Sequence, residues 1–131
     1  MSQENVDLVR STFEAWGDGD LKRVRSALDP DIEWQMAEDE PDARILHGPT
    51  EVLDMLGGWV ESFAEFLTTP QDFIDAGEHV VVPITFVARP HGADSPVTIE
   101  ETQVYTVEGG AVVKVREYRT KAEALETLGL S

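Results

Sequence analysis

Apolar residues near the start of the chain recur at the spacing of a helix. Within 4–16, Val6, Val9, Phe13 and Trp16 lie three or four positions apart. Side chains at that spacing share one face of an α-helix, so the pattern predicts an amphipathic helix that ends near the following glycine-rich turn.

A second, shorter helix is predicted after that turn. Asp20 is a suitable N-cap, and Leu21, Val24 and Leu28 would form its buried face. Pro30 disfavours a helical conformation for the residue before it, so the helix is expected to end there.

The next apolar residues alternate, and a longer helical pattern then follows. Ile32, Trp34 and Met36 alternate with polar residues, which predicts a strand with one buried face. Gly48-Pro49 opens a third predicted helix, because proline is favoured at the first helical position. Its wide apolar stripe consists of Val52, Leu53, Leu56, Trp59, Val60, Phe63 and Phe66.

Gly57-Gly58 interrupts this helical pattern, at about 1 kcal/mol per glycine relative to alanine. Two explanations are open: close packing of a neighbouring backbone, or a kink.

From residue 70 onward the period changes to two. The pattern predicts strands at 71–76, 78–89, 97–107 and 111–119. Pro83 favours an edge strand or a bulge, because it cannot donate to a ladder. Thr120 begins a capping box that predicts a final helix through Leu128. These elements predict a single α+β domain over 1–131, in which N-terminal helices pack on a curved, twisted antiparallel sheet and a short helix ends the chain.

Composition narrows the class of protein. The chain has 26 acidic and 10 basic residues among 131, a net charge of −16, and no cysteine. Such a surface repels phosphate backbones and anionic lipids, so neither nucleic acid nor membrane is an expected partner. The start of the chain lacks the pattern of a secretory signal and no apolar run could span a bilayer, which favours a cytoplasmic protein.

Metal binding is not predicted. The histidines His47, His79 and His91 lack ligand spacing, and thiolate ligands are absent. Acidic residues concentrate in 29–42, including the 38–42 loop, which is compatible with a cation site but is more typical of a solvated loop. Neither a metal nor another cofactor is therefore expected.

Several short segments resemble the SnoaL-like (polyketide cyclase-like) branch of the nuclear transport factor 2-like superfamily, in particular its small actinobacterial members. The similar segments are Trp16-Gly17-Asp18-Gly19-Asp20-Leu21, Asp29-Pro30-Asp31-Ile32-Glu33-Trp34, His47-Gly48-Pro49-Thr50-Glu51-Val52, Gly110-Ala111-Val112-Val113-Lys114-Val115-Arg116-Glu117-Tyr118, Glu123-Ala124-Leu125-Glu126 and Gly129-Leu130. The resemblance implies a cone-shaped domain in which helices close a curved sheet around an apolar pocket. It also implies a homodimer through the outer face of the sheet, for which Val104, Val112 and Tyr118 would supply apolar surface.

The resemblance also indicates which chemistry to look for. The carboxylate base, tyrosine and oxyanion-stabilising acid of the ketosteroid isomerase branch correspond here to Met36, Thr12 and Gln103, all of which depart from that pattern. The acid/base aspartate of the cyclase branch matches Glu117. The epoxide hydrolase branch has an Asp-Arg-Asp set, for which Arg89 and Glu101 would join Glu117 as the nearest residue types.

Strand parity places these residues on one face if the turn at 108–110 has three residues. Glu101 and Glu117 would then be cross-strand neighbours beside Val113 and Val115, whereas a two-residue turn would send the set outward. Two carboxylates in an apolar setting suit general acid or base chemistry.

On that register Glu117 is the candidate acid or base, Gln103 would orient the ligand, and Glu101 would tune the charge. The candidate ligand-binding residues are Trp16, Trp34, Met36, Trp59, Phe63, Tyr105 and Val115. Two hypotheses follow. The first is a small-molecule pocket protein for a largely apolar, carbonyl-containing ligand. The alternative is a cofactor-free acid/base enzyme of the cyclase, isomerase or epoxide hydrolase type.

Overall fold

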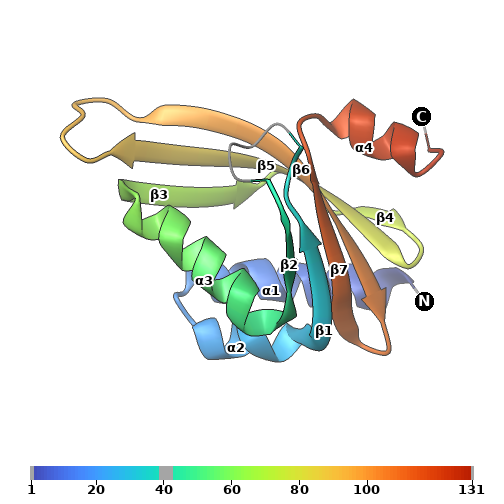
Figure 1. Ribbon diagram of the computed structural model, residues 1–131. Helices are drawn as coiled ribbons and strands as arrows, with labels where there is room; N and C mark the ends of the chain where they lie inside the picture. The colour runs from blue at the N-terminus through green and yellow to red at the C-terminus, as the bar shows by residue number, and fades with distance from the viewer. Residues whose placement is uncertain (1, 39–42, 131) are drawn as a thin grey trace.

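Helices cover both faces of a strongly curved sheet in the computed structural model, which describes residues 2–38 and 43–130 (Figure 1). The helices are α1 (Ser2–Gly17), α2 (Leu21–Ala27), α3 (Gly48–Glu61) and α4 (Lys121–Thr127). The strands are β1 (Leu28–Gln35), β2 (Ile45–His47), β3 (Phe63–Pro70), β4 (Ile74–Ala76), β5 (His79–Pro90), β6 (Val97–Glu108) and β7 (Ala111–Tyr118). The α+β class is confirmed. No helix in these two described ranges is both long and apolar enough to cross a membrane.

The sheet is mixed rather than wholly antiparallel. Its strand order is β2-β1-β7-β6-β5-β3, with β4 also paired to β5. The pairs formed by β5, β6 and β7 are antiparallel as predicted, but β1 runs parallel to β7. This arrangement brings the early strand, which carries Trp34, beside the last strand, which carries Glu117.

Two predicted N-caps are confirmed, and the end of the second helix is corrected. The Asp20 side chain accepts from the backbone N–H of Arg23, and Thr120 accepts from that of Glu123. The helix that begins after Asp20 ends at Ala27, so Leu28 is the first residue of β1 instead of the last of a helix. Leu28 is buried in either case, which is why periodicity alone did not separate the two assignments.

The third helix ends earlier than its apolar stripe predicted. Ser62 is its C-cap, and residues 63–70 form β3 on the edge of β5. Phe66 packs against Phe86 of β5 at 5.4 Å between ring centroids, a contact that a longer helix would not have. Close packing does not explain Gly57 and Gly58, because a Cβ at either position would meet nothing within 4 Å.

The strand assignments differ from the prediction in three respects. The strand predicted at 71–76 is only Ile74–Ala76, and Ile45–His47 is a short strand that was not expected. Pro83 lies in an interior strand, but at the gap between the two partners on that side of β5, where β4 pairs up to Val81 and β3 pairs from Ile84. Its missing donor is therefore tolerated there.

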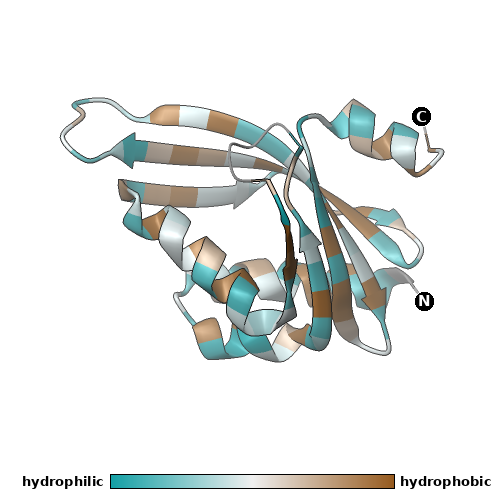
Figure 2. Ribbon diagram, in the orientation of Figure 1, coloured by the Kyte–Doolittle hydropathy of each residue, from teal (hydrophilic) through white to brown (hydrophobic). Residues whose placement is uncertain are grey.

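Two apolar clusters lie on opposite faces of the sheet. The larger lies between the inner face and α1–α3, and the smaller lies beneath α4 on the outer face. Along much of the strands, hydrophobic and hydrophilic bands alternate, as expected where only one face is buried (Figure 2). Where both faces are covered, successive residues are apolar, as at Val80, Val81 and Val82, which are all buried.

The predicted outer apolar surface is not exposed in the chain. Val104 and Tyr118 do lie on the outer face, but α4 covers them through Ala124 and its neighbours. Val112 belongs to the inner core and is 0% exposed. A monomer therefore does not leave these three side chains exposed to solvent, contrary to the prediction.

Candidate functional site

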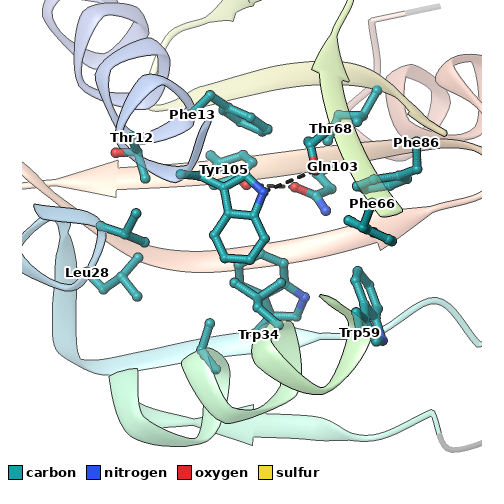
Figure 3. Close-up of a pocket in the computed structure, with 15 residues that line it drawn as sticks. Thr12, Phe13, Leu28, Trp34, Trp59, Phe66, Thr68, Phe86, Gln103 and Tyr105 are labelled. Atoms are coloured by element: carbon teal, nitrogen blue, oxygen red, sulfur yellow. Dashed lines mark hydrogen bonds between the residues drawn. The ribbon is translucent and has the colours of Figure 1, made fainter. Parts of the chain in front are cut away.

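An apolar pocket lies between the inner face of the sheet and the helices α1–α3 (Figure 3). It offers about 50 Å³ to the centres of water-sized molecules. One water molecule needs roughly 10–15 Å³ on this measure, so the pocket has room for a small organic molecule. Its lining consists of Thr12, Phe13, Trp16, Val24, Leu28, Trp34, Val52, Leu56, Trp59, Phe66, Thr68, Ile84, Phe86, Gln103 and Tyr105.

Aromatic rings from separate elements surround this space. Trp34 of β1 and Phe13 of α1 both meet Tyr105 of β6 edge to face, at 6.2 and 5.6 Å between centroids. Trp59 of α3 meets Phe86 of β5 at 6.2 Å in the same manner. Such pairs hold ring orientations well, so the walls of the pocket are fixed by packing between elements.

A chain of hydrogen bonds forms the polar wall of the pocket. The Gln103 Nε2 donates to Glu101 Oε2 at 2.9 Å, and the Tyr105 hydroxyl donates to Gln103 Oε1 at 2.6 Å. All three side chains are buried. Because a carboxylate can only accept, its position fixes the orientation of the amide, and the amide oxygen in turn takes the tyrosine hydrogen.

Glu117 lies next to this chain on β7, directly opposite Gln103. Its Oε2 accepts from Trp34 Nε1 at 2.6 Å, and its Oε1 accepts from the backbone N–H of Ala37 at 3.2 Å. The side chain is only 3% exposed. Glu117 therefore ties β7 to β1 and fixes the indole ring that lines the pocket.

The register of β6 and β7 differs from the predicted one, yet the predicted face is kept. The turn has two residues, Gly109 and Gly110, both with positive φ, as a tight hairpin requires. Val107 pairs with Val112 but Thr106 pairs with Lys114, so Val113 is the extra residue of a β-bulge. The bulge restores the inward direction that a two-residue turn alone would have reversed.

This register changes two predicted neighbours. Glu101 is not the cross-strand partner of Glu117, because Gln103 occupies that position and Glu101 lies beyond the end of β7. Val113 does not share the inner face with Val115, since it sits at the bulge and is only half-buried. Gln103 instead donates to Glu101 and is the cross-strand partner of Glu117.

The electrostatic environment of Tyr105 is negative. Burial raises the pKa of Tyr105 well above its ordinary value of 10.0, and the charges of Glu101 and Glu117 raise it further. The phenol is therefore neutral at physiological pH and keeps the hydrogen that it donates to Gln103.

Comparison with known proteins places the chain in a family. The sequence profile of the SnoaL-like domain matches residues 9–115. The chain belongs to the SnoaL-like family.

The similarity to sequence relatives and to solved structures covers almost the whole chain. Uncharacterised proteins of Mycobacterium tuberculosis and Mycobacterium bovis are 26% identical over 124 residues, which is 94% of each chain. An NTF2-like protein of unknown function from Burkholderia pseudomallei is 27% identical with a TM-score of 0.77, covering 95% of this chain and 97% of that one. TerC, co-crystallised with polyporic acid, is 18% identical with a TM-score of 0.78, covering 96% and 98%.

The pocket of this SnoaL-like protein contains some of the predicted site residues. Gln103, Tyr105 and the tryptophans Trp16, Trp34 and Trp59 line it. Val115 is fully buried in the core instead, and Phe63 packs on Phe66 outside the lining.

The other predicted residues lie beside separate, more polar hollows. Glu117 and Met36 line one of these together with Arg119, and Glu101 lines another with Ile99. Arg89 pairs with Glu65 on the far part of β3 and does not join the carboxylates. The acidic residues 39–42 lie outside the described residues, and within the described ranges no group of three His, Cys, Asp or Glu could hold a metal ion.

Sequence reasoning missed several lining residues. Phe86 was identifiable, because it alternates with Ile84 along β5 on the inner face. Thr68 was not, because it lies between the end of the predicted third helix and the strand predicted from residue 71. Thr68 accepts a hydrogen bond from Trp16 Nε1 at 3.1 Å. Thr12 was considered only as a departure from the isomerase pattern, yet it lines the pocket and donates to the Leu8 carbonyl at 2.8 Å.

Proposed function

We propose that this protein binds a small, largely apolar molecule in the aromatic pocket. The main support is the composition of the pocket lining. Aromatic and aliphatic groups surround the space, and the few polar groups include the hydrogen-bonded pair Gln103 and Tyr105. Concave, mostly apolar sites with a small number of placed polar groups are the usual form of ligand pockets.

The hydrogen bonds leave few donors for a carbonyl group in the ligand. The hydrogen of the Tyr105 hydroxyl and one Gln103 amide hydrogen are engaged with Gln103 and Glu101. The second Gln103 amide hydrogen and the Thr68 hydroxyl hydrogen remain for a ligand oxygen. The proposal therefore rests on the apolar lining with its few polar groups rather than on a ligand carbonyl.

Xenon tests whether the pocket accepts an apolar guest, because an atom of that size suits the space and binds dry apolar cavities. We expect dissolved xenon to shift the NMR signals of the Trp16, Trp34 and Trp59 indoles. Leu56→Trp should abolish the shifts by filling the pocket, whereas Leu53→Trp, on the same helix but outside the lining, should retain them. Unshifted indole signals in the unaltered chain would refute the proposal.

An acid/base enzyme that uses Glu117 is the second candidate function. The favouring observation is a buried carboxylate opposite Gln103 and beside a polar hollow. Enolisation can be followed by the loss of acetone ¹H signal in D₂O. Catalysis by this group predicts exchange above the buffer rate that Glu117→Gln abolishes and Glu101→Gln reduces. Glu100→Gln, at an exposed position on the same strand as Glu101, is the matched control. Exchange at the buffer rate, or exchange unaffected by Glu117→Gln, would exclude this function.

We also propose a homodimer through the part of the outer sheet face that α4 leaves uncovered. Leu67 of β3 is 62% exposed there, opposite Val87. Sedimentation should give a dimer at tens of micromolar, roughly the range in which weak interfaces dissociate. Leu67→Lys should shift the equilibrium to monomer, and a monomeric unaltered chain would contradict the proposal.

A further inference from the structure

We infer that the ligand of the aromatic pocket is a small alkylammonium ion, a protonated amine whose charged end meets the Tyr105 oxygen and whose carbon skeleton lies among the aromatic rings. The inference rests on the proposed binding function and names its ligand class. Three independent features carry it: the direction of the hydrogen bonds, the sign of the nearby charges and the aromatic lining.

The hydroxyl groups of the pocket present mainly acceptor capacity. The Tyr105 hydrogen is committed to Gln103, and the Thr12 hydrogen is committed to the Leu8 carbonyl. Each oxygen keeps lone pairs but has no hydrogen left to donate. Thr68 accepts from Trp16 and retains its hydrogen, so it is the one pocket hydroxyl that can still donate. A ligand that donates N–H bonds is matched to Tyr105 and Thr12, whereas a ligand carbonyl could be met only by Thr68 or by the second Gln103 Nε2 hydrogen.

The charges that act on Tyr105 at the polar wall are those of two glutamates, and Arg119 lines the hollows beside both of them. Glu101 and Glu117 lie within reach of Tyr105, where their charges help to raise the pKa of its phenol. No lysine or arginine is among the described residues that line the pocket. The net charge of −16 adds a long-range attraction for cations. These carboxylates offset part of the desolvation cost that a cation meets on entering an apolar site.

The remaining walls suit the carbon skeleton and the cation alike. The rings of Trp34 and Phe13 each pack edge to face against Tyr105, which lies between them in Figure 3. Aromatic faces attract ammonium groups most strongly where water is excluded. The small volume of the pocket favours an amine with a short branched skeleton over a long chain.

Three ligands with one skeleton separate these features: isopropylammonium, 2-propanol and acetone. They offer a cationic donor, a neutral hydroxyl and a carbonyl acceptor on the same three carbons. In NMR titrations of the whole chain at pH 7, we expect isopropylammonium to bind about tenfold more tightly than acetone, as one cation–π contact allows, with 2-propanol between them. The indole signals should shift with each ligand that binds.

Variants test whether Tyr105 supplies the preference. Tyr105→Phe removes the acceptor oxygen and should reduce the preference for isopropylammonium over acetone to less than about threefold. Thr12→Val should reduce it by a smaller factor. Tyr118→Phe, the same change beneath α4 on the outer face, should leave the preference unaltered.

The outcomes distinguish this inference from the proposed function. Acetone binding as tightly as isopropylammonium would overturn the inference, while a positive xenon result would leave the binding function intact. Equal binding of 2-propanol and isopropylammonium would overturn the assignment of a cation. A preference that survives Tyr105→Phe would overturn the placement of the charge at that oxygen.

Discussion

The two faces of the β6–β7 region are both buried, but in different ways. On the inner face Gln103 and Tyr105 form a hydrogen-bonded polar wall among aromatic rings. On the outer face Val104 and Tyr118 meet Ala124 of the short helix α4 in an apolar cluster. Of two successive residues of β6, Tyr105 therefore belongs to the candidate binding site and Val104 to the apolar packing under α4.

This difference indicates what each face contributes. A buried polar network is stabilising only while every member keeps its hydrogen-bond partner. When all partners are present, the network holds its side chains in one specific geometry, which is what it contributes to the site. Among the described residues, no deeply buried side-chain N or O atom of the molecule lacks a hydrogen-bond partner. The outer cluster carries no such requirement, and its role is to attach the C-terminal helix.

Of the changes considered, truncation of Trp34 on the inner face should lower the free energy of unfolding the most. Trp34→Ala removes a ring that is 4% exposed and also takes the indole donor from Glu117. We expect a loss of about 3–5 kcal/mol of unfolding free energy, as for other buried aromatic residues. Chemical denaturation measures it, with half-buried Trp16→Ala as a milder control. An unchanged stability would show that Trp34 is exposed.

A matched pair of valines compares the faces directly. Val81 and Val82 are adjacent in β5, both 0% exposed, and belong to the outer and inner clusters respectively. We expect Val82→Ala to cost about 2–3 kcal/mol and Val81→Ala about 1–2 kcal/mol, because the short helix over Val81 can close the cavity more easily. Equal losses in denaturant titrations would show that α4 packs as rigidly as the main core.

Much of the fold was predictable, because burial on one face leaves a period in the sequence. The strands that became β5, β6 and β7 and the α+β class were found in this way, and the caps Asp20 and Thr120 were found from their residue types. The errors share a physical cause. Phe63 and Phe66 fit the stripe of a helix equally well, and only pairing with β5, far along the chain, selects a strand.

The site was less predictable for a related reason. Val113 and its neighbours give no local signal of a bulge, so the correct face was assigned with the wrong turn and the wrong cross-strand partner. The bond between Trp34 and Glu117 joins positions 83 residues apart and depends on parallel pairing of β1 with β7. Side-chain direction follows from alternation, whereas partners across strands follow from topology.

Removal of one hydroxyl on each face sharpens the comparison further. Tyr105→Phe leaves the buried Gln103 Oε1 without its donor, which should cost about 1–3 kcal/mol. Tyr118→Phe should cost less than about 0.5 kcal/mol, because phenylalanine keeps the ring contacts with the apolar cluster and with the Arg116 guanidinium. The denaturant midpoints of both variants measure these losses. Equal shifts would contradict the distinction between the polar wall on the inner face and the apolar cluster on the outer face.

The smallest effect is a titration that needs no unfolding. The chain has two tyrosines, so Tyr118→Phe leaves Tyr105 as the sole phenol. Burial and then the charges of Glu101 and Glu117 raise the pKa of Tyr105 in the folded state above the ordinary value of 10.0.

Since the raised pKa belongs to the folded state, its contribution to stability is fully present below about pH 10 and is lost as the pH rises through the folded value. We expect no tyrosinate absorbance near pH 10 while the Tyr118→Phe chain stays folded, and an ordinary titration near that pH in guanidinium chloride. Glu101→Gln should move the folded titration toward lower pH by removing one of the two charges. A phenol that ionises near pH 10 in the folded chain would place Tyr105 in contact with solvent, and the inner face would then lack the dry polar wall that separates it from the outer one.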